Sequence, residues 1–195
     1  STAVAPAPES PTPAAAVAPR RIVAIGDLHG DIAATRAVLR LGKLVDESDH
    51  WNAGRAWAVQ CGDVLDGGVD ERPILDLFVR LRAEAAAAGG RFVMLNGNHE
   101  LMNAFGDFRY VHPGAYAAYD EFADAKTSTP KKRSKRRGRL VAYRPGGRYA
   151  KQLADNPIVF VADDTVFVHG GLLPKHLSRG VERINADARA FLLGT

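Results

Sequence analysis

Side chains that commonly bind metal ions follow four short apolar runs of this sequence, each within a few residues of the end of its run. These side chains are Asp27, His29, Asp63, Asn98 and His169. Mixed carboxylate, amide and imidazole ligands suit manganese, iron or zinc better than calcium or magnesium. Because Asp27 and His29 are two residues apart, both can point the same way and bind one ion. The pattern predicts a metal centre.

Asp63 is the residue that suggests more than one metal ion, since its two carboxylate oxygens can bridge two ions. Two ions about 3.5–4 Å apart can hold a phosphoryl group between them and turn a bound water into hydroxide at neutral pH. The predicted reaction is therefore hydrolysis of a phosphate ester by a metal-bound hydroxide.

His99 and Asp66 belong to the same motifs but have no metal role in this scheme. A histidine beside a metal ligand is well placed to protonate a leaving oxygen, and a carboxylate can fix the tautomer and orientation of its ring. We expect His99 to act as general acid and Asp66 to orient it.

The apolar runs that precede these side chains are expected to be strands. The first three cover residues 22–25, 56–61 and 92–95. A helix that begins at Asp31 and ends at Gly42, and a second that begins near Pro73 and ends before Gly89, separate them. Strands and helices that alternate in this way predict right-handed βαβ units in a parallel sheet, with the site at the carboxyl ends of the strands. The predicted fold class is α/β.

The remaining elements are a helix, a strand pair and a final helix. They are predicted at residues 114–125, at 157–161 with 165–168, and at 181–193. The block 127–139 has no aliphatic or aromatic residue and is predicted to be a basic surface insertion. Residues 1–19, nearly all Ala, Pro, Ser, Thr and Val, are expected to be a disordered tether or a leader remnant, which leaves a cytoplasmic and an exported location both open. The folded domain is expected to cover residues 20–195.

Composition is that of one globular domain, with 195 residues of which 46% are hydrophobic. The formal charge is +4, but the segment 131–137 alone carries six positive charges, so the rest of the chain is net negative. Basicity is therefore local. The single cysteine, Cys61, excludes an internal disulfide, and no stretch reaches the length of a membrane-spanning helix.

Taken together, the motifs resemble those of a known family. The segments 26–30 (GDLHG), 62–66 (GDVLD), 97–100 (GNHE) and 169–171 (HGG) are similar to the successive motifs of the calcineurin-like metallophosphoesterases, in their phosphoprotein phosphatase branch. The segment 102–111 is similar to that of the Shewanella-like phosphatases within this branch. The resemblance runs from about Arg21 to the C-terminus.

This resemblance implies an αββα sandwich and metal-dependent hydrolysis of phosphate monoesters. By it, Asp27, His29 and Asp63 hold the first metal, Asp63, Asn98 and His169 hold the second, and His99 and Asp66 form the acid pair. The implied substrates are phosphoproteins, on tyrosine or serine, or small aryl and alkyl phosphates.

Two departures from the family pattern concern substrate binding and completeness. Gly67 stands where the family has a phosphate-binding arginine, so only a backbone donor remains there, and Arg109 is the candidate to replace part of that contact. The family also continues to a further histidine and arginine that this chain, ending at Thr195, lacks. We expect the chain to be the N-terminal portion of the domain, with the sandwich incomplete at its C-terminal end.

Two alternatives remain open. Gly67 and the lacking terminal histidine favour a binding module for phosphate or phosphoproteins that has no turnover. The basic run 131–137 favours a nucleotide or nucleic-acid phosphoesterase, although it contains no aromatic residue on which a base can stack, and a solvated loop is the simpler interpretation.

Overall fold

The computed structural model describes residues 21–123 and 136–195. Its centre is a parallel sheet in the order β1-β2-β3, formed by β1 (Ile22–Ile25), β2 (Trp57–Gln60) and β3 (Arg91–Met94). In the register of this sheet, Ile22 pairs with Trp57 and Trp57 pairs with Arg91. The predicted parallel sheet is confirmed.

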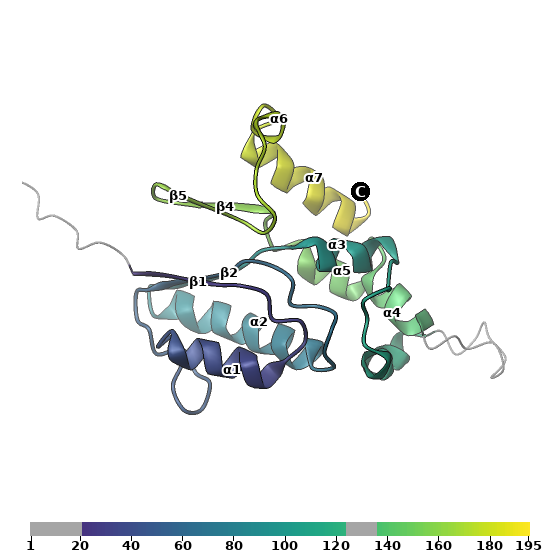
Figure 1. Cartoon of the computed structure of the whole chain (residues 1–195), viewed down its shortest axis with the longest axis horizontal. Helices are drawn as coiled ribbons and strands as arrows, with labels where there is room; N and C mark the ends of the chain where they lie inside the picture. Colours follow the sequence, from purple (N-terminus) through teal and green to yellow (C-terminus); the bar gives the residue numbers. More distant parts are fainter. Residues whose placement is uncertain (1–20, 124–135) are drawn as a thin grey trace, which may run out of the picture.

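Two helices cover one face of this sheet (Figure 1). The helix α1 (Ile32–Leu41) is capped by Asp31, whose Oδ1 accepts the N–H of Ala34 at 2.9 Å, as the sequence predicted. The helix α2 (Glu71–Ala87) contains Pro73 in its first turn, where a missing N–H costs nothing. Both helices join one hydrophobic core with the sheet, to which Leu39 and Leu81 contribute fully buried side chains.

A hairpin covers the opposite face of the sheet. It consists of β4 (Val159–Ala162) and β5 (Thr165–Val168), which pair antiparallel close to the predicted ranges. Phe160 and Ala162 of the hairpin pack with Val59, Val93 and Leu95 in a second apolar cluster. The described residues thus form three layers, namely helices, sheet and hairpin, in the order expected for an αββα sandwich.

The outer face of the hairpin is open to solvent. Val161 and Val166 pair across the two strands, and their exposed fractions are 49% and 51%. Within residues 21–123 and 136–195, no further layer buries this face.

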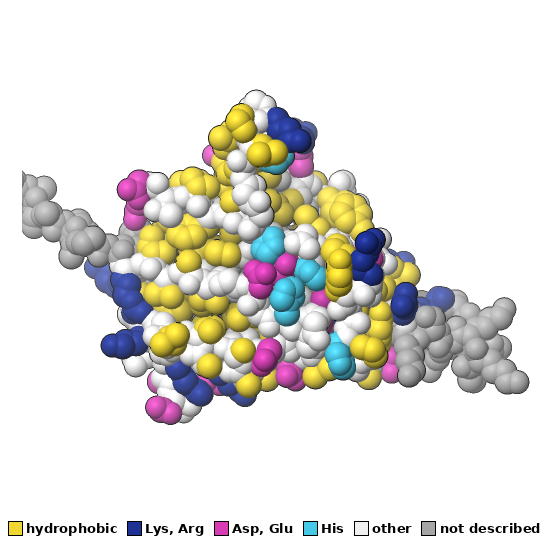
Figure 2. Space-filling view, in the orientation of Figure 1, with side chains coloured by type: hydrophobic (Ala, Val, Ile, Leu, Met, Phe, Trp, Pro, Cys, Tyr) yellow, Lys and Arg dark blue, Asp and Glu magenta, His cyan; other side chains and the backbone are white. Residues whose placement is uncertain are grey.

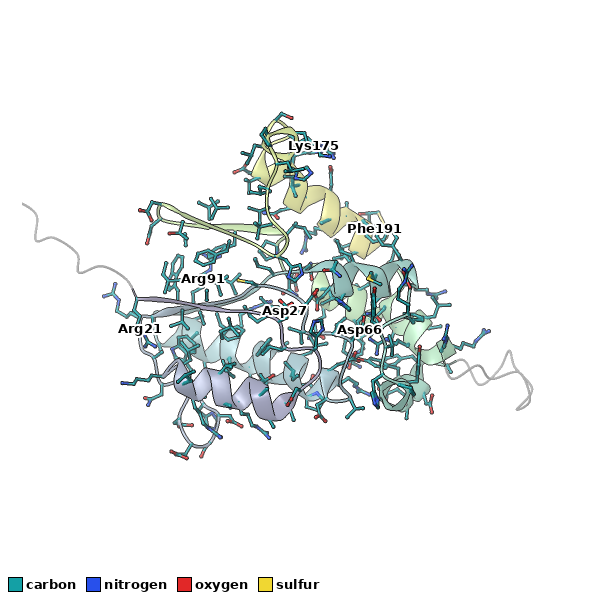
Figure 3. The ribbon with its side chains drawn as sticks, in the orientation of Figure 1. Arg21, Asp27, Asp66, Arg91, Lys175 and Phe191 are labelled. Carbon is teal, nitrogen blue, oxygen red and sulfur yellow. The ribbon has the colours of Figure 1, made fainter. Side chains whose placement is uncertain are left out.

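Six short or medium helices complete the described structure. They are α3 (Asn98–Phe105), the 3₁₀ helix η1 (Pro113–Phe122), α4 (Arg136–Tyr143), α5 (Arg148–Leu153), α6 (Pro174–Leu177) and α7 (Val181–Leu193). The helix α7 matches its predicted range. It is attached to β4 by Asn185, whose Oδ1 accepts the N–H groups of Ile158 and Val159, and to α3 by the ring of Phe191, 4.5 Å from that of Phe105 (Figure 3).

Two predicted segments differ in the structure. The segment predicted as a helix over 114–125 is a 3₁₀ helix ending at Phe122, because Tyr116, Tyr119 and Phe122 recur every three residues and so align along one side of a 3₁₀ helix. Of the predicted basic surface insertion 127–139, residues 127–135 lie outside the described part, but Arg139 is a fully buried residue of α4. Its charge can be buried because carboxylates surround it, as described below.

The predicted tether at residues 1–19 also lies outside the described residues. None of the helices described between Arg21 and Thr195 combines the length and the apolar character needed to cross a bilayer.

Candidate metal centre

The predicted metal ligands gather at the carboxyl ends of β1, β2 and β3 and at the end of β5. The distance from Asp63 Oδ2 to His169 Nε2 is 3.1 Å, and that from Asp27 Oδ2 to His29 Nε2 is 3.8 Å. Asn98 Oδ1 lies 3.0 Å from His169 Nε2. Histidine and acidic side chains accordingly meet in the middle of one face of the molecule (Figure 2), with Asp27 just beyond the end of β1 (Figure 3).

Backbone carbonyls fix the orientation of two of the histidines. Nδ1 of His29 lies 3.1 Å from the carbonyl oxygen of Leu65, and Nδ1 of His169 lies 3.0 Å from that of Cys61. Because a carbonyl oxygen only accepts hydrogen bonds, each Nδ1 must carry a proton, and the neutral form of each ring turns the lone pair of Nε2 towards the cluster. This arrangement is the usual support of a histidine that binds metal.

In the neutral form of His169, three acceptor atoms consequently meet without a donor between them. They are His169 Nε2, Asp63 Oδ2 and Asn98 Oδ1. A positive ion resolves the repulsion among such atoms, and oxygen together with imidazole nitrogen is a donor set for divalent transition metals. The residues present therefore fit a metal centre.

Asp63 is the shared member of the cluster. Atoms that could hold a metal ion form two groups, one of His29, Asp63 and His99 and one of Asp27, Asp63 and His169. Within each group the atoms lie within 4.8 Å of one another. The side chain of Asp63 is 4% exposed, and its Oδ1 also accepts the N–H of His99 at 2.9 Å. Asp63 is thus the one residue that belongs to both groups.

His99 and Asp66 form a close pair beside the cluster. His99 Nδ1 lies 2.7 Å from Asp66 Oδ2, while His99 Nε2 faces the cluster, 3.8 Å from Asp63 Oδ2. The two side chains are 13% and 1% exposed, so the contact is protected from water. The ring of His99 also packs edge-on against that of His29, with centroids 4.8 Å apart.

Glu100 is a site residue for which the sequence suggested no role. Its side chain is fully buried, and its two oxygens accept four backbone N–H groups at 2.7–3.2 Å. These groups belong to Gly97, Asp63, Val64 and Leu65. Burial raises the pKa of Glu100, whereas the N–H groups favour its charged form. Glu100 thereby joins the loop after β2 to the loop after β3.

The two residues predicted to contact phosphate, Gly67 and Arg109, both have partners within the chain. The N–H of Gly67 already donates to the carbonyl oxygen of Tyr110 at 3.2 Å, so the backbone donor expected there is occupied. Arg109 is 66% exposed, and its guanidinium pairs with Asp107 at 2.8 Å, which raises the pKa of Arg109 and lowers that of Asp107. Both outcomes follow from the loop after α3, which folds over Gly67.

The same loop brings Tyr110 to the site, a placement that the sequence did not suggest. The ring of Tyr110 lies 5.2 Å from that of His99 and is partly open to solvent. A cavity of ≈ 420 Å³ lies beside Asn98 and His169, and its lining includes the apolar side chains of Leu101 and Ile184.

A family model described as calcineurin-like phosphoesterase matches residues 20–189, which is most of the chain. The chain belongs to the calcineurin-like phosphoesterase family. Its αββ layers and the strand-end cluster agree with this membership.

Within this family, the chain is similar to proteins named Shewanella-like protein phosphatases. Shewanella-like protein phosphatase 2 of Arabidopsis thaliana is 41% identical over 90% of this chain and 52% of its own length. Shewanella-like protein phosphatase 1 of Plasmodium berghei is 34% identical over 78% of this chain and 39% of its own length. The chain thus spans about half the length of these relatives or less.

Solved structures of phosphatases share the fold. A cold-active protein tyrosine phosphatase superposes with a TM-score of 0.74 at 27% identity, over 89% of this chain and 48% of its own. The cold-active protein-tyrosine phosphatase of a psychrophilic Shewanella species gives a TM-score of 0.72 at 28% identity, over 89% of this chain and 49% of its own.

Proposed function

We propose that this chain carries the catalytic centre of a metal-dependent phosphatase that hydrolyses phosphate monoesters. The observation that carries the proposal is the meeting of His169 Nε2, Asp63 Oδ2 and Asn98 Oδ1 with no donor between them, next to a histidine paired with a buried carboxylate. A metal cluster and a proton donor side by side are what phosphoester hydrolysis requires.

In this proposal the ligands divide between two ions as in the family. Asp27, His29 and Asp63 would hold one ion, and Asp63, Asn98 and His169 would hold the other. Manganese, iron or zinc suits these ligands. Bound ions supply positive charge that stabilises a phosphoryl group and lowers the pKa of water.

The chain's own contribution to proton transfer is the pair His99 and Asp66. Asp66 holds the N–H at Nδ1 of His99, which leaves Nε2 facing the cluster. In its imidazolium form His99 would donate the Nε2 proton to the leaving oxygen and become the neutral ring protonated at Nδ1. Because the pair is almost fully buried, its geometry is kept without competition from water.

A phosphorylated protein is the proposed substrate. The names of the relatives support this choice, since those compared above are called protein phosphatases and both solved structures are called protein tyrosine phosphatases. The partly exposed ring of Tyr110 beside His99 offers an apolar contact for the group that carries the phosphate.

Turnover of p-nitrophenyl phosphate with added Mn²⁺ tests the proposal. We expect activity in the unsubstituted protein and its loss in Asp63→Asn, which removes a charge that both ions share. Asp164→Asn, in the exposed turn between β4 and β5, is the matched control and should keep full activity. Equal activity of Asp63→Asn and the unsubstituted protein would refute the proposal.

The second candidate is a phosphate-binding module without turnover, which Gly67 favours because it lacks a side chain to hold the substrate. Binding of inorganic phosphate in the presence of Mn²⁺, without hydrolysis of any monoester, is the result that favours it. Arginine at position 67 is a poor test, since the φ of Gly67 is +80° and a Cβ there would lie 3.1 Å from the Cβ of His29.

A nucleic-acid substrate has less support. The basic run on which it depends contains no aromatic residue on which a base can stack, and the guanidinium of its Arg136 lies over the ring of Tyr116 within the chain.

A further inference from the structure

Arg139 in α4 is the largest fully buried side chain of the described structure, with an exposed fraction of 0%. Four hydrogen bonds hold its guanidinium. Nε donates to Asn103 Oδ1 at 2.7 Å, Nη1 donates to Glu71 Oε2 at 2.6 Å, and Nη2 donates to Glu71 Oε1 at 2.8 Å and to Asp66 Oδ1 at 2.9 Å. A planar fork of this kind fixes its partners in both position and angle.

The carboxylate of Asp66 is divided between two tasks. Its Oδ1 accepts from Arg139 and from Asn103 Nδ2, the latter at 3.0 Å, while its Oδ2 faces Nδ1 of His99 at 2.7 Å. Oδ1 thus binds Arg139 and Asn103, and Oδ2 binds the imidazole of His99. The backbone N–H of Asp66 also donates to Glu71 Oε1 at 2.7 Å, so Glu71 is held by the same guanidinium and in turn holds Asp66.

We infer that Arg139 is a positioning residue for the Asp66–His99 pair, holding Asp66 so that Nδ1 of His99 keeps its proton and its orientation. The inference rests on the proposed function, in which His99 is the proton donor. Arg139 lies 73 positions after Asp66 in the sequence, at the end of the segment 127–139 that the sequence predicted to be a basic surface insertion.

Charge supports this assignment. With both carboxylates ionised, Arg139, Asp66 and Glu71 carry a net charge of −1, and the guanidinium offsets one of the two buried negative charges. Without the guanidinium, two carboxylates that are each 1% exposed would face each other in the interior. An unpaired buried charge of this kind is strongly unfavourable.

Two tyrosine rings pack against the guanidinium of Arg139. The guanidinium carbon of Arg139 lies 5.0 Å from the ring centre of Tyr119 and 5.1 Å from that of Tyr143, and the two hydroxyls are 2.7 Å apart. Burial, together with Glu71, raises the pKa of Tyr119, so its hydroxyl stays a neutral donor to Glu71 Oε2. The network excludes water from the face of Asp66 opposite His99.

A comparison of two esters tests the role in solution with Mn²⁺. Phenol is a poorer leaving group than p-nitrophenol, so hydrolysis of phenyl phosphate depends more on a correctly placed proton donor. In Arg139→Lys, and in the charge-balanced double variant Arg139→Met with Glu71→Gln, we expect kcat for phenyl phosphate to fall at least about tenfold further than kcat for p-nitrophenyl phosphate, with KM little changed. The double variant keeps the test informative if a lone buried carboxylate prevents folding.

Arg72→Met is the matched control. Arg72 also packs on Tyr119, with its guanidinium carbon 5.9 Å from the ring centre, but it pairs with Glu121 and not with Asp66. Its substitution should leave the ratio of the two kcat values unchanged. A merely structural role of Arg139 lowers both kcat values by one factor, and that result would overturn the inference.

A second readout does not depend on activity. In the metal-free protein, at a pH where the imidazole is neutral, ring ¹⁵N shifts of His99 should report a single tautomer protonated at Nδ1, and the Arg139 variants should show a mixture. A single Nδ1–H tautomer in those variants contradicts the positioning role. If the unsubstituted protein hydrolyses neither ester, the proposed function fails, and the NMR comparison still decides whether Arg139 positions His99.

Discussion

The carboxylate of Glu100 joins the two loops after β2 and β3, which carry the predicted metal ligands Asp63 and Asn98. It binds their backbone and is not itself a predicted metal ligand. Each of its oxygens accepts two backbone N–H groups in a fully buried setting. The positions of Asp63 and Asn98 therefore depend on a residue that binds neither metal nor substrate in the proposal.

Glu100→Gln should destabilise the protein and weaken its metal centre. A glutamine turns an NH₂ group towards backbone N–H groups, which leaves buried donors unpaired at about 1–3 kcal/mol each. We expect the free energy of unfolding in urea to fall by about 2–5 kcal/mol and Mn²⁺ binding to weaken. Glu47→Gln, at an exposed position, should change neither. An unaltered urea midpoint for Glu100→Gln would show that the four contacts carry little energy.

His99→Ala tests the proton donor directly. Loss of a general acid costs about 10²–10⁴ in rate, so kcat for phenyl phosphate should fall within that range while KM changes little. His112→Ala, at an exposed position, is the control. Retention of the full kcat by His99→Ala would exclude the residue from proton transfer.

The sequence predicted the residues that lie next to the ends of strands, because a short motif carries both the strand end and the ligand. It did not predict Arg139 or the role of Glu100. A charged residue looks the same in a sequence whether it lies on the surface or is buried among partners, and the Arg139 contacts span up to 73 positions. Such long-range pairings have no local signature.

At the scale of elements, the close packing of α4 on η1 is what delivers Arg139 to the site. Gly138 makes this approach possible, since a Cβ at that position would lie 2.1 Å from the carbonyl oxygen of Tyr119. The run 136–143 forms a helix because its buried side holds Gly138, Arg139, Ala142 and Tyr143.

Gly138→Ala should therefore act through the position of Arg139. Overpacking of this kind costs about 1–3 kcal/mol, because backbone atoms on the facing element must move. We expect a lower melting temperature together with a fall in kcat for phenyl phosphate. Leu140→Ala, a partly exposed position of the same helix, is the control and should change kcat little. A folded Gly138→Ala protein with full stability and activity would contradict the tight contact.

Tyr116, Tyr119 and Phe122 illustrate what a sequence tells about element type. Their apolar character predicted a helix. Their spacing of three residues distinguishes a 3₁₀ helix from an α-helix, but over only three turns this spacing is a weak signal in a sequence. The strands and the helices α1, α2 and α7 were predictable from their apolar residues. In α1 and α2 a start signal, Asp31 or Pro73, and a glycine after the helix agree with that pattern.

At the scale of the molecule, the layers assign opposite roles to the two faces of the β4–β5 hairpin. Phe160 is 8% exposed and packs towards the central sheet, whereas its neighbour Val161 is 49% exposed. The α/β class followed from the alternation of strands and helices in the sequence, whereas the order of layers was implied only by the resemblance to the family. The openness of the outer hairpin face is a property of the assembled layers.

Phe160→Ala and Val161→Ala should therefore differ sharply in cost. A buried phenylalanine reduced to alanine costs about 3–5 kcal/mol, and a half-exposed valine well under that. Urea unfolding of the two variants measures the difference. Equal costs would mean that the hairpin does not pack through Phe160.

The most direct test of the account is the number of metal ions bound per chain. After removal of metal, equilibrium dialysis against Mn²⁺ followed by elemental analysis gives this number for the unsubstituted protein and for Asp63→Asn. We predict two ions per chain for the unsubstituted protein and at most one, weakly bound, for Asp63→Asn. No bound metal in the unsubstituted protein, or the same metal content in both proteins, would contradict the two-metal centre.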